Sequence, residues 1–530
     1  MSAKEGSAKE GSAKEESAKK GNGRAAPLPR SAAGNHNPWL IAVIVSIATF
    51  MEVLDTTIAN VALRHIAGSL GAGQDESTYI LTSYLVSNAI ILPISGWLAN
   101  VIGRKRFYMG CVALFTFSSV MCGLSTSLGM ILFFRVLQGV GGGGLAPVEQ
   151  SIFADTFPPA KRAIAFAVYG FTIVTAPAIG PVLGGLITDN FSWHWVFFIN
   201  LPVGLLSLVL VSIFVSDSET TKKDRRALLD RGLKIDYVGF LLVALGFGTL
   251  QIVLDRFARD DGFSSPFILW LTVTCVVSLI TLVIWELTNQ QPVMNLRLLK
   301  NRGFAISNVV MFFFGFIIIS TTQLMPQLTQ ELMGYDATTA GLTLGVGGII
   351  TLFIMPLSGV LTGKIQPRYL VFVALLGIAY ALHYASGLNL NASFDYFSFS
   401  RSLMVMWLPL IFIPLAAVQF IGVPPDKNND ASALLNLMRN IGGSVGVSVA
   451  TTQLAWRSQF HHARLAEHIT AANAPQTASG LASLGHRLVV QAGILSYLDV
   501  FTILSVVALL ISPLALFLPK TPKGASAGAH

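Results

Sequence analysis

Three charged side chains stand inside long apolar runs of this sequence: Glu52, Asp55 and Arg135. Charge at the depth of a bilayer is costly, so such residues are functional candidates. Apolar surroundings favour a protonated carboxyl group, whereas a nearby guanidinium favours the carboxylate. A carboxylate held between these two influences can load a proton on one side of a membrane and release it on the other. We therefore predict a proton switch at these residues, and the alternative is a static structural ion pair.

The spacing of the three residues supports the same interpretation. Glu52 and Asp55 are three residues apart and would share one face of a helix. If the run that holds Asp55 crosses a membrane outward and the run that holds Arg135 crosses inward, the two side chains reach a similar depth.

Four further polar residues lie in apolar runs: Asn60, Gln138, Glu149 and Arg439. We expect Asn60 and Gln138 to form hydrogen bonds in a cavity. Glu149 is either a cation-attracting group in an inner vestibule or a residue at the cytoplasmic edge. Arg439 is either a gate or interface anchor, or a substrate ligand.

The composition requires a membrane protein. Of the 530 residues, 53% are apolar and 12% are charged, against about a quarter charged in soluble domains. The mean hydropathy is +0.64. This shortage of charge excludes a soluble enzyme, a disordered scaffold and a nucleic-acid binder. The three cysteines lie in apolar runs, which favours small packing residues over disulfides or metal ligands.

Apolar runs long enough to cross a bilayer core of about 30 Å follow one another along most of the chain. We predict fourteen membrane spans, at 39–63, 77–100, 106–125, 129–152, 163–187, 195–216, 236–254, 266–287, 304–325, 337–361, 369–387, 402–422, 432–455 and 497–518. Most of the 35 Lys and Arg residues fall in alternate connecting segments, which the positive-inside rule assigns to the cytoplasm. Both termini are therefore expected to be cytoplasmic, and the net charge of +8 is a topology signal.

An internal repeat predicts how these spans are grouped. Residues 92–107 and 355–370 both place Pro, Ser-Gly and Leu at matching offsets, as expected of secondary transporters built from repeats. We therefore expect an all-α integral membrane protein of two six-helix bundles with two inserted helices. The predicted parts are a disordered cytoplasmic tail at 1–38, an N-terminal bundle at 39–216, a basic linker with inserted spans 7 and 8 at 217–303, a C-terminal bundle at 304–518 and a cytoplasmic tail at 519–530.

Two segments outside the spans have their own signatures. Residues 1–20 repeat Ser-Ala-Lys-Glu, which indicates a solvated, dispensable tail of native or engineered origin. In the outer segment 456–496 we expect short helices on the membrane surface. The spacing of the histidines of that segment does not favour a metal site.

Several motifs resemble those of the major facilitator superfamily and, within it, the 14-span drug:proton antiporters of the EmrB type. They are Gly96 to Lys105, with Asn100, Gly103 and Arg104, after span 2; Arg135-x-x-Gln138-Gly in span 4; Gly180-Pro181-x-x-Gly184-Gly185 in span 5; Leu54 to Leu63 in span 1; Trp193 to Pro202; and Arg439-Asn-Ile-Gly-Gly443. The family usually has Asp where Asn100 stands, so the latch at this loop is expected to be weaker or to use a neutral hydrogen bond. The family often has Pro in place of Arg64, which leaves the turn after span 1 open.

The resemblance implies the major facilitator fold and a proton-coupled multidrug efflux transporter of the bacterial inner membrane. It also implies hydrophobic toxic substrates, a periplasmic adaptor of the EmrA kind, an outer-membrane channel of the TolC kind and gating roles for the glycine-rich motifs. No phosphate-binding Gly-x-x-x-x-Gly-Lys-Ser/Thr loop is present in the sequence, so we expect drive by a proton gradient and no cofactor. The alternatives are an exporter of one lipid or metabolite, a membrane-embedded enzyme such as an acyl transferase, and a non-transporting sensor.

Overall fold

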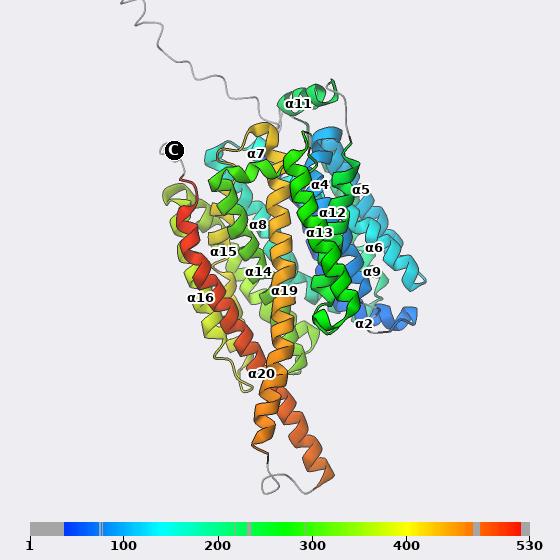
Figure 1. The fold of residues 1–530 in the computed structure, drawn as a ribbon, viewed down its shortest axis with the longest axis vertical. Helices are drawn as coiled ribbons and strands as arrows, with labels where there is room; N and C mark the ends of the chain where they lie inside the picture. The colour runs from blue at the N-terminus through cyan, green and yellow to red at the C-terminus, as the bar shows by residue number, and fades with distance from the viewer. Residues whose placement is uncertain are drawn as a thin grey trace, which may run out of the picture.

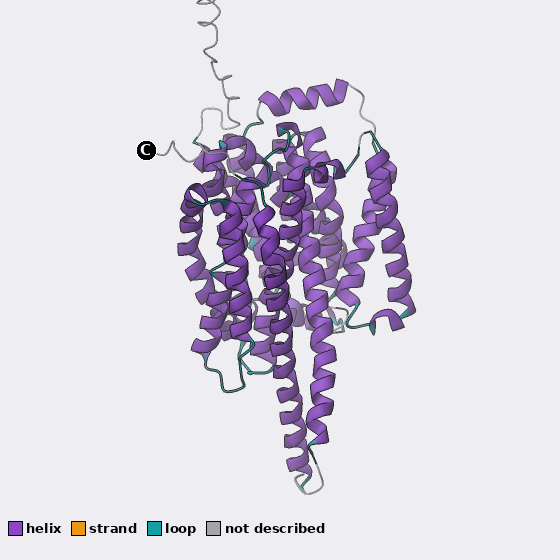
Figure 2. Cartoon of the chain, turned by 60° about the vertical axis from the view of Figure 1, so that its left-hand side comes forward, coloured by secondary structure: helices purple, strands orange, loops and turns teal. Residues whose placement is uncertain are grey.

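The computed structural model describes residues 37–73, 76, 78–217, 219–230, 235–290, 292–469 and 477–520. These residues form long helices and short connections, without a strand in the described ranges (Figure 2). Most of the two predicted tails, at 1–36 and 521–530, lies outside the described residues.

The N-terminal half consists of helices that each begin or end close to a predicted span boundary. They are α2 (Pro38–Leu70), α4 (Tyr79–Ile102), α5 (Arg104–Gly123), α6 (Leu128–Gly142), α7 (Leu145–Thr156), α8 (Pro159–Asn190), α9 (His194–Phe198) and α10 (Asn200–Phe214). Helix α2 packs against α8 and α10, and α6 packs against α4 and α5. The glycine run in span 4 divides that span into α6 and α7.

An inserted unit follows, with α11 (Glu219–Asp230), α12 (Tyr237–Arg256), α13 (Pro266–Thr288) and the 3₁₀ turns at Gly262–Ser264 and Leu296–Lys300. The C-terminal half then contains α14 (Arg302–Glu331), α15 (Ala337–Lys364), α16 (Pro367–Ala385), α17 (Phe394–Val405), α18 (Pro409–Val418), α19 (Asn428–Glu467) and α20 (Ala478–Ile511), with 3₁₀ turns at Pro425–Lys427 and Ser512–Phe517. Helices α12 and α13 pack on each other, and α12 packs against α4 (Figure 1).

The described helices include 12 that are long and apolar enough to cross a membrane, or up to 13 if the bent helix α8 counts as one span. The remaining expected span is α19, which runs through the bundle against α14 and α20 (Figure 1). The faces of α19 toward other helices carry buried Asn, Ser and Gly residues, so its hydropathy is lower than that of the 12 helices counted above. The total of fourteen spans stays a prediction.

The prediction of short surface helices at 456–496 is wrong. Helix α19 continues to Glu467 and α20 begins at Ala478, so two spans extend as a helical hairpin beyond the bundle (Figures 1 and 2). The Ala-, Gln- and Arg-rich sequence has high helix propensity and no proline before Pro475, so nothing interrupts either helix. We call the end of the bundle that carries this hairpin the hairpin end. The opposite end, where α11 lies across the bundle, is the basic end (Figure 1).

The two halves pack on each other along two lines. Helix α8 contacts α15 and α18, and α19 contacts α4 and α7. Stacked rings mark the first line, with Tyr169 against Phe412 and Phe166 against Phe420. Polar side chains mark the second line, at the basic end.

Candidate functional site

A fully buried ion pair lies in the N-terminal half. The Arg135 guanidinium donates from one Nη to Asp55 Oδ2 at 2.7 Å, and neither side chain is exposed to solvent. Asp55 is on α2 and Arg135 is on α6, so the two expected spans do bring these residues to the same depth. Ion pairing offsets the large cost of removing both charges from water.

Amide side chains complete the coordination of Asp55. Gln138 Nε2 donates to Asp55 Oδ1 at 3.0 Å, and Asn200 Nδ2 donates to the same oxygen at 2.6 Å. Gln138 also accepts from Arg135 at 2.8 Å, one turn earlier on α6. The Asp55 carboxyl group therefore accepts from three hydrogen-bond donors. A proton that binds Asp55 must compete with Arg135 for it.

The position of Arg135 is fixed by neighbouring elements. Its Nε donates to the backbone oxygen of Ile80 on α4 at 3.0 Å, and its guanidinium lies 4.6 Å from the centre of the Tyr84 ring. A side chain at Gly139 would collide with Ser87 of α4, so glycine allows the close approach of α6 and α4 that this geometry needs.

Glu52 has different partners from Asp55. It accepts from the Tyr84 hydroxyl at 3.2 Å and from Asn88 Nδ2 at 3.3 Å, and it is only half-buried. Because the Tyr84 ring also covers Arg135, Tyr84 connects the two carboxylates of α2 indirectly. The two acids share a helix, yet each belongs to its own hydrogen-bond cluster.

Two other predicted site residues lie away from this network. Glu149 on α7 is completely buried and accepts from Ser46 Oγ at 2.5 Å, while its Oε2 has no partner among the described residues. Both interpretations of Glu149, as a cation-attracting group of an inner vestibule and as a residue at the cytoplasmic edge, stay predictions. Asn60 is exposed on α2 and does not join the Asp55 cluster. The amide beside Asp55 is instead that of Asn200.

At the basic end, a polar gate joins the two halves between α4 and α19. Asn100 Nδ2 donates to Asp430 Oδ1 at 2.9 Å, and Asn429 donates to the Asn100 oxygen. Asn100 therefore makes one hydrogen bond between neutral amides, with Asn429, and one to the carboxyl group of Asp430, both across to the other half. Removal from water raises the pKa of Asp430, while Lys427 opposes that rise.

Helix α7 adds a second layer to this gate. Ser151 contacts Asn429, and Asp155 accepts from Asn428 Nδ2 at 2.9 Å. Asp155 also pairs with Arg104, which is buried at the start of α5. Arg104 thus acts on the gate through Asp155 rather than by direct contact with the other half.

The glycines and the lysine of the loop motif each have a local role. A Cβ at Gly96 would lie 3.0 Å from the Asn429 oxygen, so glycine permits the contact with α19. Gly103 has φ 96°, a conformation that L side chains rarely adopt, and it turns the chain from α4 into α5. Lys105 donates from Nζ to the Ser212 oxygen at 2.7 Å. The motif therefore fastens the loop and brings Asn100 to α19.

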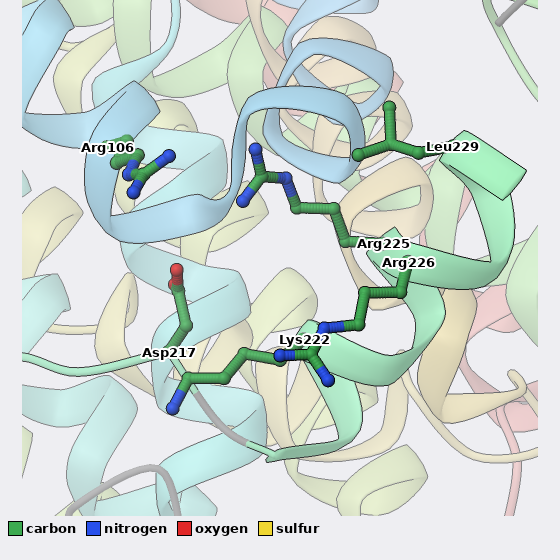
Figure 3. Close-up of a pocket in the computed structure, with 6 residues that line it drawn as sticks. All are labelled: Arg106, Asp217, Lys222, Arg225, Arg226 and Leu229. Atoms are coloured by element: carbon green, nitrogen blue, oxygen red, sulfur yellow. The ribbon is translucent and has the colours of Figure 1, made fainter.

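A cationic cavity of about 290 Å³ lies beside this loop, between α11 and the beginning of α5 (Figure 3). Its lining residues are Arg106, Asp217, Lys222, Arg225, Arg226 and Leu229. Arg225 Nε donates to the Val101 oxygen at 2.9 Å, and Asp217 accepts from the Lys105 backbone at 3.0 Å. Helix α11 is thereby bonded to the end of α4 that carries the gate.

Deeper in the bundle, Arg439 of α19 donates to the Tyr169 hydroxyl of α8 at 3.1 Å. It therefore lies at the interface of the two halves, as expected for an anchor. Its backbone is packed so tightly against α14 that no side chain fits at Gly315.

The glycine-proline motif of span 5 lies where α8 bends. The helix turns by 44° between Lys161–Pro177 and Val182–Thr188, around Gly180 and Pro181. A Cβ at Gly180 would collide with Thr57 of α2, and one at Gly184 would lie 3.3 Å from the Ile58 oxygen. Gly185 is also buried. The predicted kink and close helix contact are both present.

One buried cation, Arg401, is missing from the predicted site residues. The predicted span 402–422 leaves it in an outer segment. Arg401 lies within α17, which begins at Phe394, and it is only 7% exposed. The sequence predicts that this span begins at 402, because Asp395, the serines before it and Arg401 itself lower the hydropathy. The feature of the sequence that could have indicated a buried Arg401 is its position directly before an apolar run.

The histidines of segment 456–496 lie on the hairpin. His461 Nε2 is 2.9 Å from Asp499 of α20, and Arg457 Nε is 3.5 Å from the same carboxylate. These contacts hold the two hairpin helices together. Within the described ranges, no group of three or more potential metal ligands is found.

Comparisons with known proteins agree with this architecture. The family description "Major Facilitator Superfamily" matches residues 45–447. The multidrug export protein EmrB of Escherichia coli K12 is 39% identical over 444 residues, which cover 82% of this chain and 83% of that protein. The fatty acid resistance protein FarB of Neisseria gonorrhoeae is 33% identical over 503 residues, covering 92% and 97%.

A solved structure supports the fold alone. The proton:xylose symporter XylE, bound to 6-bromo-6-deoxy-D-glucose, has a TM-score of 0.60 at 16% identity and covers 91% of this chain and 96% of its own. The many membrane-crossing helices and the transporter relatives exclude the enzyme alternative and indicate a multi-pass protein of the inner membrane. The chain therefore belongs to the major facilitator superfamily of membrane transporters, and within it to the EmrB-type proteins.

Proposed function

We propose that this chain is a proton-coupled multidrug efflux transporter that exports hydrophobic toxic compounds by alternating access. The names of the relatives support multidrug export. The observation that carries proton coupling is the completely buried Asp55, which accepts hydrogen bonds from an arginine and two amides.

In the proposed cycle, Asp55 alternates between an ionised form paired with Arg135 and a protonated form. As an anion it keeps Arg135 and Gln138 bound, which ties α2 to α6. When it takes up a proton it becomes a poor acceptor for Arg135, so the tie weakens and α2 can move relative to α6. One proton moving through about 100 mV yields roughly 2.3 kcal/mol, enough to concentrate a substrate about fifty-fold.

The gate between α4 and α19 supplies the other part of the cycle. It holds the basic end closed through Asn100 and Asp430, and the basic end is the expected cytoplasmic end. Opening toward the cytoplasm requires these bonds to break together with the contacts of Asp155. In alternating access, one end of the transporter closes while the other opens.

Proton-driven transport of a dye into inverted membrane vesicles tests the proposal. Wild-type vesicles are expected to accumulate an ethidium-like dye on energisation, and D55N is expected to lose at least ten-fold in rate. Asp395→Asn, an exposed acid at the start of α17, is the matched control and should transport as the wild type does. Equal transport by D55N and the wild type under the same gradient would refute the proton switch.

We further propose that the hairpin end docks a periplasmic adaptor of the EmrA kind, which connects to an outer-membrane channel of the TolC kind. Support comes from the long helices that project there and from their exposed apolar side chains Phe460, Leu481 and Val489. Co-purification of the full chain with an EmrA-type adaptor tests this. Phe460→Ser should weaken recovery of the adaptor, whereas Phe517→Ser, at the basic end, should not; unchanged recovery by both variants contradicts docking at the hairpin.

Export of a specific lipid is the second candidate function, because FarB is named for fatty acid resistance and aligns over nearly the whole chain. A growth assay distinguishes the two. Protection against long-chain fatty acids, without protection against cationic dyes, would favour a lipid exporter.

A further inference from the structure

Among the described residues, the buried guanidinium of Arg401 in the C-terminal half has no carboxylate partner. Arg401 donates from one Nη to Thr322 Oγ1 at 2.9 Å and from the other to Thr321 Oγ1 at 3.4 Å. Its Nε has no hydrogen-bond partner in the part of the chain that the structure describes, and no salt bridge to it is found there. A guanidinium has five N–H donors and no acceptor, so much of its capacity is unused.

The internal repeat shows what is missing. Arg135 and Arg401 lie at the same position of their helices, because Leu128 begins α6 and Phe394 begins α17. Each of these helices has a serine cap and is followed by a second helix within the same span. The interval from Arg135 to Arg401 equals that from Asp55 to Thr321, so Thr321 stands where the first half has its buried carboxylate.

The two threonines are neutral, so they cannot balance the positive charge of Arg401 as a carboxylate would. Their hydroxyl protons point to backbone oxygens of α14, with Thr321 donating to Ile317 at 2.8 Å and Thr322 to Ile318 at 2.7 Å. Their lone pairs therefore face Arg401, as neutral acceptors. A buried charge without a counter-charge is costly, and an anion that enters the site removes that cost.

We propose that Arg401, Thr321 and Thr322 form an anion subsite that takes the carboxylate of an amphiphilic substrate. The inference rests on the proposed export function and adds a substrate class to it. A guanidinium binds a carboxylate through two parallel N–H···O bonds. The surroundings of Arg401 are apolar, because Phe397 and Val405, one turn before and one turn after it on α17, are buried in the core.

The test compares an acid with its neutral ester. Purified full-length chain in an uncharged detergent is titrated with cis-parinaric acid and, separately, with its methyl ester, both of which are fluorescent. The wild type is expected to bind the acid more tightly. Arg401→Gln should lower the affinity for the acid at least ten-fold and leave the affinity for the ester unchanged.

Two further variants serve as controls. Arg401→Lys keeps the charge but not the two-pronged geometry, so it should keep part of the preference for the acid. Arg464→Gln removes an exposed arginine of the hairpin and should change neither affinity. This control separates the loss of a buried cation from a general loss of positive charge.

Equal binding of acid and ester by the wild type would overturn the proposal, as would an unchanged preference in Arg401→Gln. If Arg401→Gln does not fold, the wild-type comparison and Arg401→Lys still decide the matter. Dye transport in vesicles is measured in parallel. Failure of dye transport with an intact acid preference refutes the export function but not the anion subsite, and the reverse result refutes only the subsite.

Discussion

The two halves of this transporter carry the same arginine in two different electrostatic settings. In the N-terminal half, Arg135 is neutralised by Asp55 and two amides accompany the pair. In the C-terminal half, Arg401 meets two hydroxyls. The repeated fold thus holds two buried arginines, one paired with the chain's own carboxylate and one that we propose pairs with the carboxylate of a substrate. We infer that the first half takes up and releases protons and that the second half binds the substrate.

The largest effect is expected where the buried ion pair of Asp55 and Arg135 is broken. Replacing Asp55 by Thr gives the first half the residue of the second, and Arg135 loses its counter-charge. Proton-coupled dye transport in inverted vesicles should fall at least ten-fold, and folding stability should drop by about 3–5 kcal/mol because a buried charge is left unpaired. A variant that transports at the wild-type rate would show that this ion pair has no part in coupling.

The converse change should give Arg401 a counter-charge within the chain. Thr321→Asp places a carboxylate within reach of Arg401 and makes the second half resemble the first. The preference for cis-parinaric acid over its ester should fall about ten-fold, which is about 1.4 kcal/mol of binding free energy. Thr321→Asn is the matched control, because it has the same shape without the charge and should keep the preference. Loss of preference in both variants would point to a steric effect instead.

These contrasts mark how far the sequence alone could lead. Asp55 and Arg135 were predictable because a charge within a long apolar run is rare and costly. Asn200 was not predictable as a partner of Asp55, because a neutral amide at the start of an apolar helix is not costly enough to stand out. It lies in the family motif from Trp193 to Pro202, but the motif does not show what it contacts. Arg401 was assigned to an outer segment because hydropathy locates a span's boundary only to within a few residues.

Long-range pairing was the part that no local pattern contained. The replacement of Asp by Asn100 suggested a weakened latch, but the acceptor Asp430 lies on a helix more than three hundred residues away in the chain. The hairpin was missed for a different reason. Hydropathy detects only the apolar part of a helix, and α19 continues past it with polar helix-forming residues.

The gate shows the same asymmetry in reverse, with the charge in the second half and the neutral amide in the first. Asn100→Asp would place two carboxylates against each other and weaken the closed gate. In an Ala433→Cys background, labelling of that buried position by a thiol reagent should speed up several-fold. The exchanged pair Asn100→Asp with Asp430→Asn should restore slow labelling. If it does not, the two side chains do not act as a pair.

The gate should also respond to pH. Because burial raises the pKa of Asp430, the group takes up a proton at a higher pH than an exposed aspartate does. A carboxyl group whose pKa is higher in the closed gate than in water binds a proton more tightly when the gate is closed, so the closed gate is favoured at low pH and loses stability as the pH rises through the raised pKa. Lys427 favours the anion and Asp426 opposes it. Thiol labelling of the Ala433→Cys variant should therefore slow in acid and speed up as the pH rises, and adding Asp430→Asn should remove that dependence.

The smallest effect is expected at the hairpin, which only the second half has: the corresponding helices of the first half, α8 and α10, are joined by a short connection through α9. Asp499→Asn removes the acceptor of His461 and Arg457, but these groups are partly exposed, and exposed ion pairs are worth about 0.2–1 kcal/mol. Thermal unfolding should shift little, and Glu467→Gln, which removes a more exposed pair with Arg464, should shift it less. Recovery of an EmrA-type adaptor is the sharper measurement, because splaying of the two helices would separate Phe460 from Leu481 and Val489. A large loss of stability without loss of adaptor would mean that the hairpin supports the second half itself, and the two halves would then differ in how they fold as well as in what they bind.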